Sequence, residues 1–345
     1  MAGKLRVGII GLNMGRYHLD GYLKCPDVQV AALCELNQNL LDEFLPRAPG
    51  ARGYRDYGKM LAEKLDIVSV VTPNYLHAPM TIDALRSGAH VLVEKPMSTN
   101  VADGQKMVQA ARKCRRKLMI HHNHRFHPMA WHLHRLIEEK ALGEIYYIRA
   151  RWHRRCGIPP LGWFTTKKLS GGGALFDIGV HCLDLAMWFM GFKRVQTVTG
   201  AQFGVFGPRI ARRQKKTFDV DDLSVALLKL AGGASITLET SWAVNLPGEE
   251  FSLEVCGTEG GAVLKPWENL RLFTDDAADG KSDSVITRYT PGPASAVSHF
   301  VECVRENRQP LVAGERGVDV LRVLDAIRRS SASGREVRLN AQSYV

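Results

Sequence analysis

Three side chains in this chain have the types and spacing needed to move a proton and to stabilise a developing negative charge. Lys95 stands in Glu94-Lys95-Pro96, where its ammonium could polarise a substrate oxygen as a point charge and Glu94 could orient it. Asp177 and His181 are four residues apart in a segment of helical pattern, so they share one helix face. An imidazole titrates near physiological pH and is a natural base, while a carboxylate beside it could bind a substrate hydroxyl or orient the ring. Such a set fits the oxidation of a secondary alcohol, although a His–Asp pair on a helix is often only structural.

A glycine-containing turn near the N-terminus could bind a dinucleotide. The first apolar run ends in Gly11-Leu12-Asn13-Met14-Gly15, and a helical pattern follows, so a pyrophosphate could rest on the helix N-terminus. The usual Gly-x-Gly-x-x-Gly is replaced by Gly-x-Asn-x-Gly. We expect Asn13 to take the place of a turn glycine, because Asn tolerates a left-handed backbone. The alternative is a strand–helix turn that binds nothing.

Glu35 follows the second apolar run, about 20 residues after this turn, where a carboxylate would accept hydrogen bonds from the adenosine ribose. A carboxylate there repels a 2′-phosphate, and no Arg follows immediately in Leu36-Asn37-Gln38. The expected cofactor is therefore NAD, with NADP less favoured. A solvated charge at a strand end is the alternative for Glu35.

Up to about residue 122, short apolar runs alternate with amphipathic stretches. The predicted strands are Val7–Ile10, Val28–Leu33, Ile67–Val71, His90–Val93 and Leu118–Ile120, with helices at Leu76–Ser87 and Val101–Lys113. This alternation predicts a doubly wound parallel sheet of the Rossmann type in residues 1–122. Lys95 would then lie at the carboxyl end of a strand, where open α/β sheets bind ligands.

In residues 123–345 the apolar runs alternate more with polar residues and are separated by glycine-containing turns. We expect this part to form an α+β domain with a large, mostly antiparallel open sheet. The predicted strands are Ile145–Trp152, Val195–Val205, Ser224–Leu230, Ala234–Trp242 and Phe251–Cys256. The predicted helices are Pro128–Ala141, Ala174–Met190, Ser295–Glu306 and Gly317–Ser331. The last two helices could pack back toward the first domain.

Five stretches of the sequence resemble the Gfo/Idh/MocA family, named for glucose–fructose oxidoreductase and inositol dehydrogenase. They are Val70–His77, His90–Pro96, Asn123–Pro128, Gly172–His181 and Phe300–Val337. The resemblance implies a Rossmann domain followed by an α/β domain whose open sheet is usually used for oligomerisation, here into a homodimer or homotetramer. It implies NAD(P)-linked hydride transfer at a carbon of a sugar, inositol or related polyol. It also suggests a cis peptide bond before Pro96.

The same resemblance assigns roles to the candidate residues. Lys95 becomes the electrostatic catalyst, His181 the acid–base group and Asp177 a substrate ligand. Arg125 could meet the substrate or pair with a carboxylate across the domain junction, and Trp163 could stack on a sugar face or pack in the core. The residues expected at the cofactor are Gly11, Asn13, Met14, Gly15, Glu35, Thr72, Pro73, Asn74, His77, Glu94 and Lys95. Asn74 could equally be a helix N-cap.

Two other functions use the same features. An enzyme that retains NAD could oxidise its substrate transiently and so cleave a glycoside or epimerise a sugar. A non-enzymatic regulator that senses dinucleotide is less favoured, because it should have lost Lys95 or the Asp177 and His181 pair.

Composition narrows the remaining classes. The net charge is +11, but the two dense basic runs, Arg112–Lys117 and Arg209–Lys216, contain no aromatic residues, which argues against nucleic-acid binding. The seven cysteines are scattered without a Cys-x-x-Cys pair, which argues against a disulfide framework. No signal peptide or membrane-spanning run is expected, so the prediction is a cytoplasmic protein. The histidines from His121 to His134 are not expected to hold a metal ion.

Overall fold

The computed structural model describes residues 3–276 and 280–340. The chain forms two compact units. The first consists of Met1–His122 and Pro293–Val318, and the second of Asn123–Gly292 and Asp319–Val345. Residues 293–318, late in the chain, are thus grouped with the N-terminal residues.

The first unit contains a six-stranded sheet in which every paired strand is parallel. The strands are β1 (Leu5–Ile10), β2 (Val28–Cys34), β3 (Arg52–Tyr54), β4 (Ile67–Val70), β5 (His90–Val93) and β6 (Leu118–Ile120), in the order β3-β2-β1-β4-β5-β6. Every side chain of β4 is buried, as expected for a strand covered on both faces. The predicted doubly wound sheet is confirmed, and its order reverses between β1 and β4, where such sheets bind ligands.

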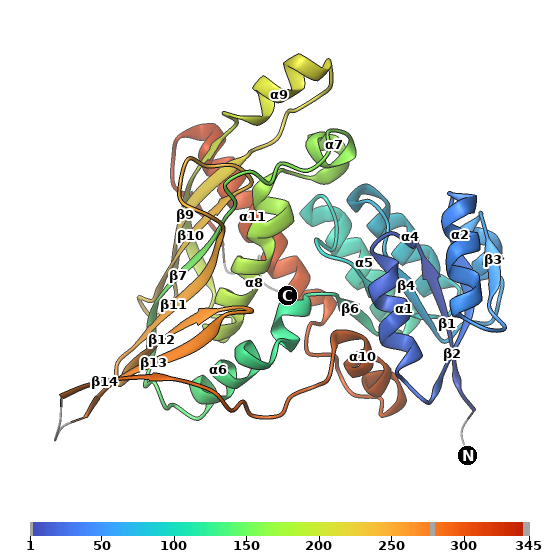
Figure 1. Cartoon of the computed structure of the whole chain (residues 1–345), viewed down its shortest axis with the longest axis horizontal. Coiled ribbons are helices and arrows are strands. Elements are labelled where there is room, and N and C mark those ends of the chain that lie inside the picture. Colours follow the sequence, from blue (N-terminus) through green and yellow to red (C-terminus); the bar gives the residue numbers. More distant parts are fainter. Residues whose placement is uncertain (1–2, 277–279, 341–345) are drawn as a thin grey trace. The chain divides into compact units, whose positions relative to one another are not determined.

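Helices connect these parallel strands. They are α1 (Gly15–Leu23), α2 (Gln38–Phe44), α3 (Tyr57–Leu61), α4 (Asn74–Arg86) and α5 (Val101–Cys114), with a short 3-10 turn at Leu45–Arg47. Helix α10 (Ala296–Arg305) comes later in the chain and belongs to the same unit. Figure 1 shows α4 and α5 side by side. Helix α4 begins one residue earlier than an Asn74 N-cap would require: Pro73 is the cap and Asn74 is the first helical residue.

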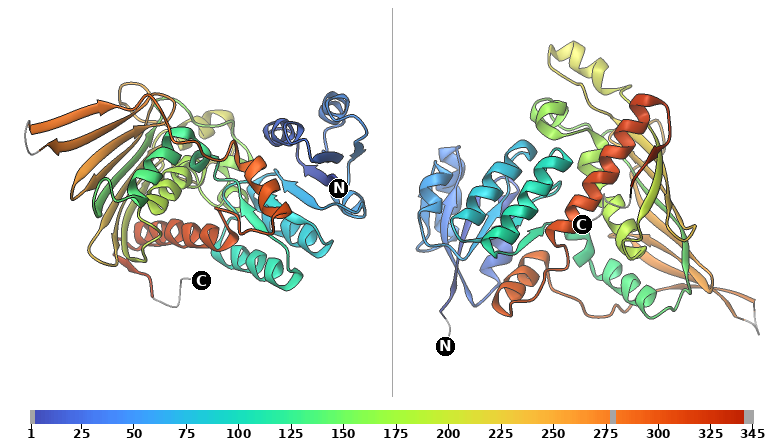
Figure 2. Two further views of the ribbon diagram at one scale, coloured as in Figure 1. Left: turned by 90° about the horizontal axis from the view of Figure 1, so that it is seen from below. Right: turned by 180° about the vertical axis from the view of Figure 1, so that it is seen from behind.

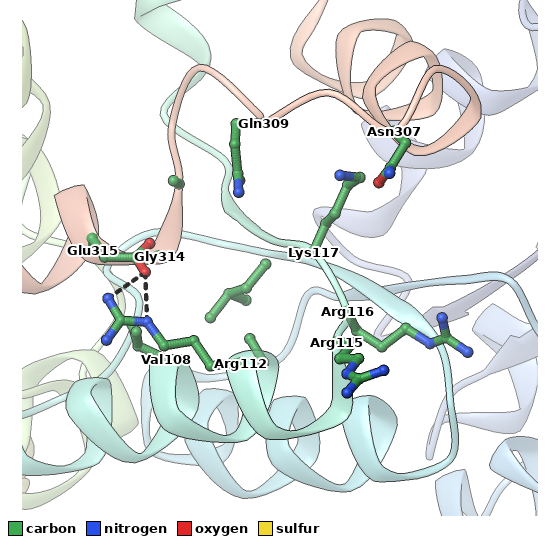
Figure 3. Close-up of a pocket in the computed structure, with 12 residues that line it drawn as sticks. Val108, Arg112, Arg115, Arg116, Lys117, Asn307, Gln309, Gly314 and Glu315 are labelled. Carbon is green, nitrogen blue, oxygen red and sulfur yellow. Dashed lines mark hydrogen bonds and ion pairs between the residues drawn. The ribbon is translucent and has the colours of Figure 1, made fainter.

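The basic run Arg112–Lys117 lies at the end of α5 and just before β6, where it lines a pocket of about 280 Å³ (Figure 3). Arg112 donates from two nitrogens to Glu315, at 2.9 and 3.1 Å. The run precedes β6, so it lies at the amino edge of the parallel sheet, whereas Lys95 follows β5 at the carboxyl edge. These charges are therefore separate from the predicted catalytic edge.

The second unit is built on a nine-stranded sheet whose strand pairs are all antiparallel except β7 with β10. Its order is β14-β13-β12-β11-β7-β10-β9-β8-β15. The strands are β7 (Ile145–His153), β8 (Val195–Phe203), β9 (Leu223–Leu230), β10 (Ser235–Ser241), β11 (Glu250–Gly257), β12 (Gly260–Lys265), β13 (Asn269–Asp276), β14 (Gly280–Val285) and β15 (Val337–Arg338). The predicted mostly antiparallel sheet is confirmed.

Helices cover one face of this sheet. They are α6 (Pro128–Glu138), α8 (Val180–Phe189) and the later part of α11 (Gly314–Ser333), while α7 (Lys167–Ser170) and α9 (Gly207–Gln214) lie in connections. In Figures 1 and 2 no described helix lies on the opposite face. Strand β9 explains the difference between the faces, since its residues alternate strictly between buried and exposed. Among the described residues, no helix has the length and apolar character needed to cross a membrane.

Candidate active site

The glycine turn after β1 lies against the end of β4. Gly11 has φ +87°, and a Cβ placed on it would lie 2.3 Å from the Val71 carbonyl oxygen, so a side chain cannot fit there. The left-handed position of the turn is therefore filled by Gly11. The expectation for Asn13 was wrong, because Asn13 is not among the described residues with positive φ.

The residues of this turn fit a dinucleotide. Asn13 and Met14 are exposed just before α1, no side chain caps that helix, and no acidic residue occupies its first turn. The helix N-terminus thus offers its backbone N–H groups and positive dipole to a pyrophosphate without a competing carboxylate. When bound there, NAD would supply the hydride acceptor for an alcohol.

Glu35 is fixed beside the same turn. Its Oε2 accepts a hydrogen bond from the Leu12 N–H at 2.9 Å, and its Oε1 accepts one from the Asn37 N–H at 3.0 Å. Each oxygen keeps a lone pair for a ribose hydroxyl. Sequence reasoning missed Arg55, which donates to the carbonyl oxygen of Leu36, the residue after Glu35, at 2.8 Å. Arg55 is 19 residues from Leu36 in the sequence, so no local motif indicated this contact.

Glu94 holds the Lys95 turn through its carboxylate. The Lys95 backbone N–H donates to Glu94 Oε2 at 3.0 Å. The other oxygen, Oε1, lies 3.1 Å from His18 Nε2 and 2.8 Å from His121 Nδ1. These partners come from α1 and from the end of β6, so the turn after β5 is fixed from both sides. The Lys95–Pro96 peptide bond is cis, as the family resemblance suggested.

Proton positions in this network follow from a chain of donors. Tyr22 Oη lies 2.8 Å from Ser69 Oγ, which lies 3.1 Å from His18 Nδ1. If Tyr22 donates to Ser69 and Ser69 donates to a neutral His18, the His18 Nε2–H is left to donate to an ionised Glu94. Burial lowers the pKa of His18 to about 4. Burial alone would raise the pKa of Glu94, but His121 and His18 hold it well below its ordinary value. Both shifts agree with this assignment.

His77 ties two of these turns together. Its Nδ1 lies 2.7 Å from the Pro96 carbonyl oxygen and its Nε2 lies 2.7 Å from the Thr72 carbonyl oxygen, and its side chain is fully buried. Burial lowers its pKa. The structure therefore places this expected cofactor ligand between the turns after β4 and β5, where a carbonyl oxygen faces each ring nitrogen and a neutral ring can donate to one of the two. Thr72 and Pro73 are half-buried above it.

The histidines between His121 and His134 have separate partners. His132 accepts a hydrogen bond from the Thr290 backbone N–H at 3.0 Å, and His134 stacks on Trp188 with 3.9 Å between ring centroids. Among the described residues, the group with atoms close enough to share an ion is His18, Glu94 and His121. The hydrogen bonds above already use the facing atoms of that group.

In the second unit, Asp221 fixes the start of the segment that carries Asp177 and His181. A Cβ on Gly173 would lie 1.8 Å from the Asp221 carbonyl oxygen. The Asp221 carboxylate accepts hydrogen bonds at 2.8 Å from the backbone N–H groups of Gly173 and Leu175. Burial raises the pKa of Asp221. The glycine run is therefore required by close packing, and sequence reasoning missed its anchor.

Asp177 lies in a π-helical turn, Leu175–Gly179, that leads directly into α8. The predicted helix Ala174–Met190 thus begins with a wider turn of a kind that often occurs at functional sites. The buried indole of Trp242 donates to Asp177 Oδ2 at 2.9 Å. His181, on the first turn of α8, meets the His124 ring edge-on with centroids 4.5 Å apart.

Two candidate substrate residues have partners of their own. Arg125 is 1% exposed and donates to both oxygens of Asp184, at 2.7 and 2.5 Å. Arg125 thus pairs with a carboxylate, but the partner belongs to the second unit itself, whereas the expected pair would have crossed the domain junction. Trp163 is half-buried and stacks on Phe164 with 3.8 Å between centroids.

Comparison with known proteins agrees with this geometry. Residues 5–122 match a model described as an oxidoreductase family with an NAD-binding Rossmann fold, and residues 131–263 match the GFO/IDH/MocA C-terminal domain. D-glucoside 3-dehydrogenase of Escherichia coli (strain K12) is 30% identical over 97% of each chain. Aldose-aldose oxidoreductase from Caulobacter crescentus, solved with glycerol, has a TM-score of 0.84 at 28% identity and covers 97% of this chain and 100% of its own. Levoglucosan dehydrogenase, solved with NADH and levoglucosan, has a TM-score of 0.87 at 25% identity. The match covers 97% of this chain and 99% of that chain.

The fold and the glycine turn define an NAD-binding oxidoreductase with a separate α/β unit. More closely, the chain belongs to the Gfo/Idh/MocA family. The predicted family, fold and cofactor class are thus confirmed.

Replacing Glu35 tests the choice of cofactor. Glu35→Ala should raise the ratio of kcat/KM for NADP to that for NAD by about tenfold or more, because the variant lacks the carboxylate that accepts from the ribose and repels a 2′-phosphate. Initial rates with each cofactor measure it, and Glu43→Ala, an exposed carboxylate on α2, is the matched control. A wild-type preference for NADP, or an unchanged ratio in Glu35→Ala, would contradict the assignment.

Replacing His18 tests the buried network. In the unfolded chain His18 has a pKa of about 6.5, whereas in the folded protein its pKa is about 4. Between these two pH values the unfolded state binds a proton that the folded state does not. The free energy of unfolding should therefore rise with pH across that window. In His18→Gln, which keeps a donor toward Glu94, the slope should fall by up to about 1.4 kcal/mol per pH unit. Urea unfolding at several pH values measures it, and an unchanged slope would show that His18 is protonated in the fold.

Proposed function

We propose that this protein is a dehydrogenase that oxidises a ring or chain secondary alcohol of a sugar, inositol or related polyol with NAD. The observation that carries the proposal is the Lys95 turn, held by Glu94 at the carboxyl edge of the parallel sheet that also presents Gly11 and Glu35. The names of the relatives, a glucoside dehydrogenase and a levoglucosan dehydrogenase among them, support the substrate class.

Each catalytic group has a role that its surroundings support. The positive charge of the Lys95 ammonium stabilises the negative charge that develops on the substrate oxygen as the alkoxide forms. His181 accepts the hydroxyl proton, and its first-turn position on α8 keeps the imidazole at a fixed orientation. Asp177, held by the Trp242 indole, accepts a hydrogen bond from a second substrate hydroxyl. When bound, NAD would supply the hydride acceptor.

The cofactor would be held by residues at the ends of β1, β2 and β4. We assign the pyrophosphate to the turn of Gly11, Asn13, Met14 and Gly15, and the adenosine ribose to Glu35. Thr72, Pro73 and Asn74 line the nicotinamide side. His77 and Glu94 act as positioning residues. His77 faces the backbone carbonyls of two turns, and Glu94 is bonded to the Lys95 N–H and to the rings of His18 and His121.

We also propose that the protein is cytoplasmic and forms a homodimer or homotetramer. Its seven cysteines are unbridged thiols, which suits a reducing compartment. The helix-free sheet face carries the partly exposed Val225 and Leu227 beside the ion pairs of Arg149 with Glu239 and Glu254. Such a mixed apolar and charged face suits an isologous contact between copies. Light scattering in solution measures the mass, and a monomer at micromolar concentration would contradict the proposal.

A substrate screen tests the function. Purified protein with NAD should produce NADH, read at its absorbance band, with at least one member of a panel of glycosides, aldoses, inositols and open-chain polyols. His181→Asn should lower kcat about 10²- to 10⁴-fold because the proton acceptor is lost. Lys95→Met should lower it about 10²- to 10³-fold.

The control in that screen is NAD affinity, which both variants should retain. NADH that forms only in amounts equal to the enzyme would favour the retained-cofactor reaction instead. Turnover left unchanged by His181→Asn would contradict the assigned acid–base role.

A further inference from the structure

A cluster of aromatic rings lies beside His181 in the second unit. Trp152 on β7 and Phe251 on β11 are register partners and stack with 4.3 Å between centroids and 6° between planes. The His124 ring is edge-on to both, at 5.7 and 5.2 Å, and also to His181 at 4.5 Å. The proposed acid–base residue is therefore connected through His124 to the stacked rings of Trp152 and Phe251.

Trp267 is the exposed ring of this cluster. Its centroid lies 5.2 Å from His124, 5.5 Å from Phe251 and 6.0 Å from Trp152. Trp152 and Phe251 are 6% and 5% exposed, whereas Trp267 is 61% exposed. One histidine ring thus separates a solvent-exposed indole from the proposed acid–base group.

The backbone at Trp267 does not favour a large side chain. The residue lies in the turn from β12 to β13, in which the Glu268 N–H donates to the Lys265 carbonyl at 3.0 Å. Pro266 takes the second place of that turn, and Trp267 takes the third with φ +70°. A turn with Pro second and positive φ third usually has Gly or Asn in that position. Bulky residues at positive φ gather at functional sites, where another requirement outweighs the strain.

We propose that Trp267 is the platform on which the ring of the substrate stacks, so that it selects cyclic sugars over open-chain polyols. A pyranose chair presents several C–H groups on one face, and the negative face of an indole attracts such positively polarised hydrogens. A chain polyol presents no fixed apolar face. Because His124 bridges Trp267 and His181, a ring seated on the indole has its edge hydroxyls directed toward the proton acceptor. The inference rests on the proposed sugar dehydrogenase function and names the shape of its substrate.

The experiment compares four proteins: wild type, Trp267→Gly, Trp267→Phe and Tyr146→Ala. Glycine suits positive φ, so Trp267→Gly removes the ring without straining the turn, and thermal unfolding checks that the fold is kept. Phenylalanine restores an aromatic face. Tyr146 is an exposed aromatic at the other end of β7 and serves as the control.

KM and kcat are measured with methyl D-glucoside, D-glucose and myo-inositol as cyclic substrates, and with sorbitol and xylitol as open chains. In Trp267→Gly, KM for the cyclic substrates should rise about tenfold while kcat changes by less than about threefold. Trp267→Phe should recover most of the lost affinity. The open-chain kcat/KM and all values for Tyr146→Ala should stay as in wild type.

The outcomes separate this inference from the proposed function. A wild-type protein inactive on the whole panel would overturn both. An active wild type with the same KM in Trp267→Gly, or an active wild type that uses only open chains, would overturn the role of Trp267 alone. The same holds if Trp267→Gly changes the mass in light scattering, since the ring would then pack against a second copy.

Discussion

The first unit's site depends on the hydrogen bonds of the Glu94 carboxylate, whose side chain is 15% exposed. An ionised carboxylate out of water must have each oxygen satisfied, and here His18, His121 and the Lys95 N–H do so. Because those donors come from different elements, satisfying one charge also fixes where β5 ends relative to α1 and β6. The Lys95 backbone is thus positioned as a consequence of solvating Glu94. His77 adds a second tie from the end of β4 to Pro96.

The second unit follows the same principle with different groups. Asp221 is buried and bonded to the N–H groups of Gly173 and Leu175, so the turn before Asp177 cannot move without leaving a buried charge unsatisfied. Trp242 then orients Asp177 itself. Loss of one partner in either network should cost more than an ordinary surface hydrogen bond, because the group left behind remains buried. Rigid support of this kind keeps catalytic groups in their productive geometry.

Much of the fold could be predicted because buried strands have characteristic patterns of apolar residues in the sequence. Strands such as Ile67–Val70 are apolar throughout, and β9 alternates strictly, so both kinds of sheet could be predicted. Helix α9 could not, because it carries the basic run after Arg209 and has only two buried residues. The strands Gly260–Lys265 and Asn269–Asp276 were missed because glycine and charged residues interrupt their alternation.

The site was readable only where neighbours in sequence are neighbours in space. Glu94, Lys95, Asp177 and His181 lie in short motifs. Their supports do not: His18 meets Ser69 across 51 residues, and Trp242 meets Asp177 across 65. The expectation for Asn13 failed for a similar reason: the left-handed position is Gly11, where the close approach of the Val71 carbonyl leaves no room for a side chain.

The most direct test of this account is the kcat of Glu94→Gln with a verified substrate at saturating NAD. The amide of Gln places an N–H₂ group where Glu94 presents an acceptor oxygen to histidine or backbone donors. The Lys95 turn should then lose its fixed position, although the Lys95 ammonium keeps its charge. We predict a kcat lowered about a hundredfold or more, with the affinity for NAD changed little. The melting temperature should fall by a few degrees, because donors around Glu94 lose their acceptor. A kcat within about twofold of wild type would contradict the claim that this carboxylate positions Lys95.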